Sequence, residues 1–415
     1  MKQDTIPPRN YNTCRLSNGL RIIHLPSASP VVYCGYQIAA GTRHELPGEE
    51  GMAHFCEHMT FKGTKRHNAL QIINGLEQLG GDLNAFTNKE DTMFYAAIQK
   101  EHFLRAVDLL TDIVFCSQYP QHEVEHEVDV ICDEIESYND TPAELIYDLF
   151  ENQLFKGHPL GHNILGTREQ VQCFTSQHAL RFTQRYYRPD NAIFFAYGDV
   201  NFTRLVKRLE SRREEGGTMN EITPILDISP SSLLPPHSSN KQEHHQAHVM
   251  LGCQSFSYND SRRMSLFLLN NILGGPGMNA RLNLKLREQH GLVYTVESSM
   301  ASYSDTGVWS VYFGCDHHDV KRCIRLVRRE LDRMMQAPLT ERQFVAAKRQ
   351  LKGQLTIAAD NREQFALDMA KHFLHYGKER SLEEMIEQID AITAPQLQDV
   401  AQQLFAPEHM QQLIL

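Results

Sequence analysis

Two histidines and a glutamate near residue 55 are spaced for metal chemistry. The segment 51–61 reads GMAHFCEHMTF and lacks proline, and acids precede it, so we expect a helix. His54 and His58 are four residues apart, which places both imidazoles on one helical face about a turn apart, as two ligands of one metal require. Glu57 adjoins His58 and could reach a metal-bound water without being a ligand. This H-x-x-E-H order reverses the commoner H-E-x-x-H.

A catalytic zinc site needs a third protein ligand and one open position. Segment 121–138, QHEVEHEVDVICDEIESY, carries apolar residues at helical spacing, namely Val124, Val128, Ile131 and Ile135. Glu127 and Glu134 are two turns apart beside this stripe, where an unpaired charge is costly and a metal would remove the cost. Each motif alone has a plainer explanation as a charged helix face, and the chain has 21 histidines. A structural zinc site would need a fourth ligand, for which His122 and His126 are the candidates.

These residues belong to the first of two similar halves. Residues 211–245 are rich in Pro, Ser, Gly and charge and are interpreted as a linker between domains 1–210 and 246–415. Both halves predict strand, strand, helix, helix: 82–86, 92–99, 101–115 and 121–138 in the first, and 292–300, 307–314, 318–335 and 341–358 in the second. We therefore expect an α+β fold of two similar domains, each a mainly antiparallel sheet with helices on one face.

Composition excludes several classes of protein. The net charge is −10 without a Lys/Arg block, so nucleic acid is not an expected partner. No stretch is apolar enough for a membrane helix, and the N-terminal sequence resembles neither a signal nor a transit peptide, so we expect a cytoplasmic protein with no membrane partner. Nine irregularly spaced cysteines without Cys-x-x-Cys favour neither a disulfide framework nor a cysteine zinc site.

Over nearly its whole length the chain resembles the pitrilysin/insulinase family of inverted zinc peptidases, in particular the single-size subunits related to mitochondrial processing peptidase. The segment GMAHFCEHMTFKGT at 51–64 matches the zinc-helix region of that family, and VICDEI at 130–135 matches the context of its third ligand. The resemblance implies zinc bound by His54, His58 and Glu134, with Glu57 as general base. It also implies that Glu127 supports the site from behind the ligands.

Two further segments resemble that family. GGDLNAFT at 80–87 matches an edge strand on which the substrate pairs as an added β-strand, which implies substrate binding by Asn84, Ala85 and Phe86. Arg287 and Tyr294, seven residues apart, match an Arg/Tyr pair that the second domain supplies to the active site. The resemblance further implies two domains that face each other as a clamshell.

The sequence therefore predicts a zinc-dependent endopeptidase that hydrolyses peptides or unfolded segments, with one zinc ion per chain. Because both the zinc residues and the Arg/Tyr pair are kept, we expect a self-sufficient homodimer. The alternative is a catalytically weak subunit that binds peptides as the partner or scaffold of a hetero-oligomeric processing peptidase.

Overall fold

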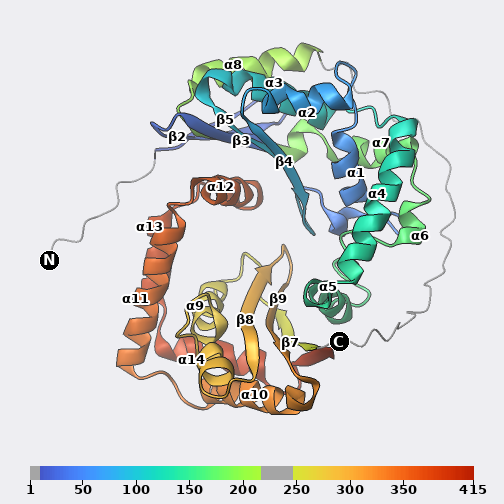
Figure 1. The fold of residues 1–415 in the computed structure, drawn as a ribbon. Coiled ribbons are helices and arrows are strands. Elements are labelled where there is room, and N and C mark those ends of the chain that lie inside the picture. The colour runs from blue at the N-terminus through green and yellow to red at the C-terminus, as the bar shows by residue number, and fades with distance from the viewer. Residues whose placement is uncertain (1–9, 216–245) are drawn as a thin grey trace. The chain divides into compact units, whose positions relative to one another are not determined.

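The computed structural model describes residues 10–215 and 246–415, and the chain forms two compact units (Figure 1). Among the described residues, unit 1 comprises 10–137, 162–215 and 361–380, and unit 2 comprises 138–161, 246–360 and 381–415. The units therefore do not coincide with the contiguous domains 1–210 and 246–415, because each half of the chain gives one helical segment to the other unit. Of the expected linker, 211–215 is helical and 216–245 lies outside the described residues.

Unit 1 is built on a six-stranded sheet in the order β1-β2-β6-β3-β5-β4. Only the pair β2 and β6 is parallel, and the other neighbours are antiparallel. The strands are β1 (Asn12–Arg15), β2 (Arg21–Pro26), β3 (Val31–Ile38), β4 (Asp82–Thr87), β5 (Thr92–Gln99) and β6 (Ala192–Gly198). Their aromatic and β-branched residues suit a buried pleated surface.

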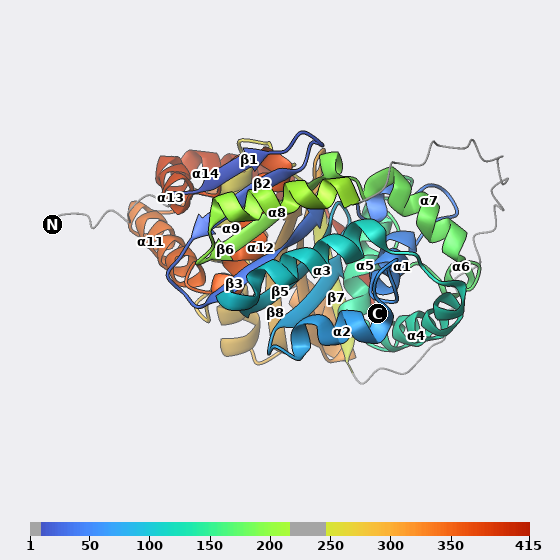
Figure 2. The same ribbon diagram turned by 90° about the horizontal axis from the view of Figure 1, so that it is seen from above.

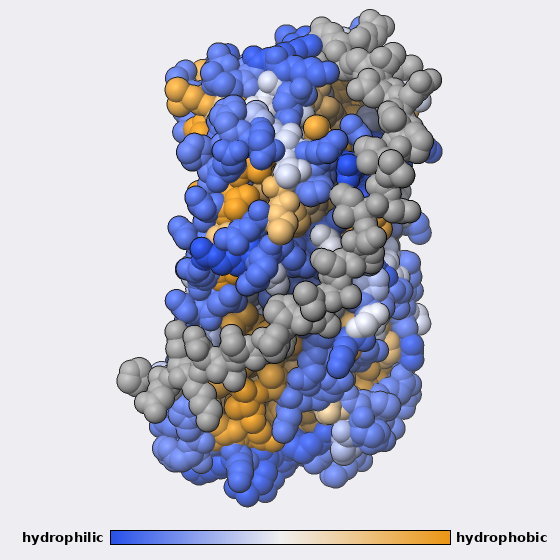
Figure 3. All heavy atoms as spheres, turned by 90° about the vertical axis from the view of Figure 1, so that its right-hand side faces the viewer, coloured by the Kyte–Doolittle hydropathy of each residue, from blue (hydrophilic) through white to orange (hydrophobic). Residues whose placement is uncertain are grey.

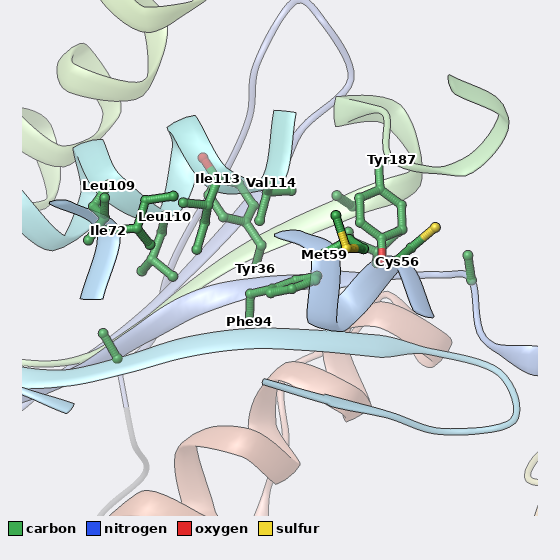
Figure 4. Close-up of a cluster of buried hydrophobic side chains, with 14 of the residues drawn as sticks. Tyr36, Cys56, Met59, Ile72, Phe94, Leu109, Leu110, Ile113, Val114 and Tyr187 are labelled. Carbon is green, nitrogen blue, oxygen red and sulfur yellow. The ribbon is translucent and has the colours of Figure 1, made fainter. Parts of the chain in front are cut away.

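The helices of unit 1 are α1 (Met52–Thr60), α2 (Ala69–Glu77), α3 (Phe103–Cys116), α4 (Gln121–Asn139), α6 (Arg168–Val171), α7 (Ser176–Tyr186), α8 (Phe202–Glu215) and α12 (Arg362–Tyr376). Figure 2 shows α3 and α8 lying across one face of the sheet. Alternate residues such as Tyr36 and Phe94 point into the core under these helices (Figure 4). The opposite face of the sheet presents Tyr33 and Tyr197 to α12, and the Arg362 guanidinium lies over both rings.

A buried carboxylate attaches α12 to the sheet of unit 1. Asp91, 1% exposed, lies in the β4–β5 turn. Its Oδ2 is 3.2 Å from His375 Nε2 and 3.5 Å from Lys371 Nζ, both on α12. Its Oδ1 accepts hydrogen bonds from the side-chain amides of Gln37 and Asn88. Although burial opposes it, these partners hold the pKa of Asp91 well below its usual value. The second half of the chain thus completes the fold of unit 1 through a paired charge.

Unit 2 contains a four-stranded antiparallel sheet in the order β10-β7-β9-β8. The strands are β7 (Ala247–Ser255), β8 (Val293–Ser302), β9 (Gly307–Cys315) and β10 (Gln411–Ile414), and the helices are α5 (Pro142–Leu154), α9 (Arg263–Gly274), α10 (Val320–Gln336), α11 (Glu341–Ala358), α13 (Leu382–Ala391) and α14 (Ala394–Phe405). One face of the sheet, including Val249 and Trp309, packs in the core under α9, α10 and α14. The other face, including Met250 and Tyr312, packs against Phe150 of α5.

The expected internal repeat is present as two sets of matching elements. β4, β5, α3 and α4 in the first half correspond in order to β8, β9, α10 and α11 in the second, each within a residue or two of its expected ends. The protein is therefore an α+β protein of two domains, as the sequence predicts. In the ranges 10–215 and 246–415, no helix is long and apolar enough to span a membrane.

Candidate metal centre

Helix α1, which carries the H-x-x-E-H motif, begins at a glycine in tight contact. Gly51 has φ +95°, and a Cβ there would lie 2.7 Å from the Leu165 carbonyl oxygen, so only glycine fits. The free N–H groups of the first turn are satisfied by Glu45, whose carboxylate accepts from Gly51 N at 3.0 Å and from Ala53 N at 2.7 Å. The sequence pointed instead to the acids directly before the helix, and Glu49 pairs with Arg185.

The apolar side of α1 fixes how the helix is rotated. Cys56 and Met59 are fully buried and point into the core with Tyr36 and Phe94 (Figure 4). Burial raises the pKa of the Cys56 thiol well above its usual value, so Cys56 is a packed apolar side chain beside the motif. Because the helix is anchored on this side, His54 and His58 project from another.

His54, His58 and Glu134 meet in one place. His54 Nε2 lies 3.8 Å from Glu134 Oε1, and His58 Nε2 lies 3.4 Å from Glu134 Oε2. One donor atom from each residue lies within 4.8 Å of the other two. Among the described residues, this group contains no fourth donor from His122 or His126, which lie exposed on α4. Two imidazoles and one carboxylate that converge in this way could hold a metal ion.

The chemistry of these donors fits a divalent cation. Burial and the neighbouring His58 lower the pKa of His54 to about 4, and the hydrogen bond from His58 lowers the pKa of Glu134. Burial opposes protonation of His58, but hydrogen bonds to Glu127 and Glu134 raise its pKa to about 9. His54 is thus neutral and Glu134 ionised, as metal ligands must be, whereas His58 would have to release its Nε2 proton to bind a metal. Among described side chains, the buried Nδ1 of His54 has no hydrogen-bond partner.

Glu127 lies behind His58, one of the three candidate ligands. Its Oε1 is 2.9 Å from His58 Nδ1, and its side chain is only 7% exposed. Although burial opposes it, hydrogen bonds from His58 and Lys62 lower the pKa of Glu127. An ionised carboxylate can only accept, so His58 Nδ1 donates to Glu127, and Nε2 is the ring nitrogen that faces Glu134. Carboxylate–histidine pairs of this kind set the tautomer of metal ligands.

Glu57 is a further polar residue of the site, and a residue of β4 forms a hydrogen bond with it. Thr87 Oγ1, at the end of β4, donates a hydrogen bond to Glu57 Oε2 at 2.5 Å. Burial raises the pKa of Glu57, and the Thr87 hydrogen bond opposes that shift. Glu57 adjoins His58 on α1 and is not one of the three donors of the cluster. The sequence match at 80–87 included Thr87 as its last residue, but gave no sign of this contact.

The predicted substrate-binding residues lie on an edge strand. Asn84, Ala85 and Phe86 belong to β4. In the described part of the chain, β5 is the only strand that pairs with β4. Asn84 is exposed, and Ala85 and Phe86 are half-buried. An edge of this kind has backbone groups available to pair with an extended peptide.

Arg287 and Tyr294 belong to unit 2. Arg287 lies on a π-helical turn (Asn283–Glu288), and its guanidinium is 3.9 Å from Glu288. Tyr294 lies near the start of β8 within a shift of register between Val293 and Val296, and it is 83% exposed. A tyrosine that neither packs in the core nor is covered departs from the usual burial of large aromatic residues, so its side chain is available for contacts.

The face that carries α4 is strongly polar. Figure 3, which views the side of α4 and α6, is mainly hydrophilic in its upper part. The exposed acids of α4 include Glu125, Asp129, Asp133 and Glu136. Of the two acids that flanked the apolar stripe in the sequence, the fold buries Glu127 and leaves Glu134 partly exposed.

Comparison with known proteins places the chain in a family. Residues 22–168 match the model of insulinase (peptidase family M16), and residues 174–351 match that of the peptidase M16 inactive domain. The chain therefore belongs to the insulinase family of peptidases, family M16.

Several relatives are similar over almost their full length. The chain is 31% identical over 406 residues to the protein of Bacillus subtilis called uncharacterized zinc protease YmxG, covering 97% of each. It is 33% identical over 402 residues to an uncharacterized zinc protease of Rickettsia bellii, covering 96% of this chain and 95% of the relative.

Solved structures show the same fold. A protease from Helicobacter pylori aligns with a TM-score of 0.88 at 20% identity, covering 98% of this chain and 99% of that one. A peptidase M16 inactive domain from Pseudomonas fluorescens aligns with a TM-score of 0.84 at 18% identity, covering 98% and 97%.

Proposed function

We propose that the protein is a zinc-dependent endopeptidase that cleaves peptides or unfolded segments. The observation that carries the proposal is the convergence of His54, His58 and Glu134, with Glu57 held beside them by Thr87. The names of the relatives as zinc proteases support zinc as the metal. The ligand types, two imidazoles and one carboxylate, also suit zinc.

In this proposal each side chain has one task. His54 and His58 would bind zinc through Nε2, and Glu134 through a carboxylate oxygen, while Glu127 holds the ring of His58. Zinc bound there would supply Lewis acidity and bring the pKa of a water molecule down toward about 7. Glu57 would accept the proton of the attacking water and deliver it to the leaving amine. The free edge of β4 at 84–86 would hold the peptide extended.

The roles of Arg287 and Tyr294 rest on the family resemblance. We propose that the hydroxyl of Tyr294 donates a hydrogen bond to the developing oxyanion and that Arg287 orients the peptide. If so, Tyr294→Phe should lower kcat and leave zinc content unchanged. Equal kcat for Tyr294→Phe and wild type would remove Tyr294 from the mechanism.

The decisive experiment combines metal analysis with peptide cleavage. Zinc content is measured by mass spectrometry, and cleavage is followed with a quenched fluorogenic peptide library. The wild type should carry about one zinc per chain and cleave, whereas Glu57→Gln should keep zinc and not cleave. Glu134→Gln should lose zinc, while Glu125→Gln, on the exposed side of the same helix, should behave as wild type.

Each contrary result has a distinct meaning. If the wild type binds zinc but cleaves nothing in the library, the protein is a peptide-binding partner or scaffold subunit. If the wild type binds no metal, the ligand assignment is wrong. The proposed homodimer is tested separately by light scattering during gel filtration, where a monomer mass would contradict it.

A further inference from the structure

Lys62 makes a contact that the sequence alone does not predict. It is the second residue after α1, in the turn that leads to α2. Its Nζ lies 2.5 Å from Glu127 Oε2, while Glu127 Oε1 is bonded to His58 Nδ1. The Lys62 side chain is only 28% exposed. Both oxygens of the Glu127 carboxylate therefore have a partner, one on α1 and one in the turn that follows it.

A carboxylate held at both oxygens cannot rotate freely. With only His58 as partner, Glu127 could turn about its side-chain bonds, since one hydrogen bond does not fix the carboxylate plane. With Lys62 on the other oxygen, the plane is fixed relative to α1. The Nδ1–H of His58 then has one acceptor in one place, so the imidazole is held with Nε2 toward Glu134.

We propose that Lys62 is a positioning residue of the metal centre, which acts on metal affinity through Glu127 and His58. The inference rests on the metal centre proposed above. It assigns Lys62 a task that differs from that of the ligands and of Glu127, because the ion pair of Lys62 is with Glu127, the residue that orients a ligand.

A neutral variant of Lys62 loses both a positive charge and an anchor, and these two losses have opposite effects on metal affinity. The direction of the change in affinity therefore tests the inference. A lysine near a divalent cation repels it, so removal of the charge alone would tighten metal binding. Removal of the anchor would weaken metal binding, because outer partners of ligands typically contribute a factor of about 10 to 100 in affinity. If Lys62 works by positioning, its neutral variant binds zinc more weakly in spite of the lost repulsion.

The test is the zinc dissociation constant of the full chain, measured by competition with a chromophoric chelator. Lys62→Met should bind zinc about tenfold more weakly than wild type. Lys65→Met is the matched control, since Lys65 is an exposed lysine in the same turn, and it should bind as wild type. In a Glu127→Gln background, Lys62→Met should add no further loss.

The outcomes separate this inference from the proposed function. If the wild type binds zinc and Lys62→Met binds equally or more tightly, the positioning role is wrong while the peptidase proposal stands. The role is also wrong if the loss persists in full without Glu127. If the wild type binds no zinc, the metal centre and this inference fail together. Circular dichroism of the metal-free proteins checks folding, and Lys62→Gln replaces the methionine variant if that one is unfolded.

Discussion

The hydrogen bond from Thr87 to Glu57 gives the sharpest test of how the site is assembled. Thr87→Val keeps the shape of a buried, β-branched residue and removes the hydroxyl that donates to Glu57 Oε2 at 2.5 Å. A hydrogen bond to a charged group contributes about 1.5–3 kcal/mol. Since about 1.4 kcal/mol corresponds to a tenfold change in rate, complete loss of this orientation would lower kcat by roughly 10- to 150-fold.

The expected loss lies in kcat. Thr87 holds the proposed general base and is not itself a metal ligand, so zinc content should not change and KM should change little. Thr92→Val is the matched control: Thr92 is a buried threonine of the neighbouring strand β5, and its hydroxyl donates to the Ala40 carbonyl oxygen at 2.8 Å. Its kcat should stay near that of wild type. Thermal unfolding shows whether both variants are equally folded.

Two results would refute this reasoning. If Thr87→Val and Thr92→Val have equal kcat, Thr87 does not orient the base. If Thr87→Val loses zinc, its effect is on the architecture of the site and its kcat says nothing about Glu57.

Two further predictions concern the stability of each unit by itself. The pKa of Asp91 is depressed in the folded state, so its contribution to the free energy of unfolding is present above its ordinary pKa and is lost as the pH falls below about 4. Asp91→Asn should flatten that pH dependence in denaturant titrations, and an unchanged slope would contradict the role of the pair with His375. Phe150→Ala should cost about 3–5 kcal/mol and raise hydrogen exchange in β7 and β10, whereas Leu70→Ala, at a site 65% exposed, should not. Faster exchange in β2 instead of β7 would contradict the assignment of α5 to unit 2.

The helical periodicity of the sequence is enough to predict the central residues of the site. The helical repeat alone puts His54, Glu57 and His58 on one side of α1, and the apolar stripe of α4 fixes which of its sides faces inward. The residues by themselves left Glu127 and Glu134 as rival third ligands, and the family resemblance favoured Glu134. In the structure, Glu134 lies against both imidazoles and Glu127 lies behind His58.

Only the tertiary structure decided which distant groups meet. Glu45 satisfies the start of α1, Thr87 holds Glu57, and Lys62 holds Glu127. The sequence does not show which partner a carboxylate has, because the partner depends on which elements pack together. The exchange of α5 and α12 between the two halves has the same origin: an amphipathic helix shows that it needs an apolar surface, but the sequence does not show which sheet supplies it.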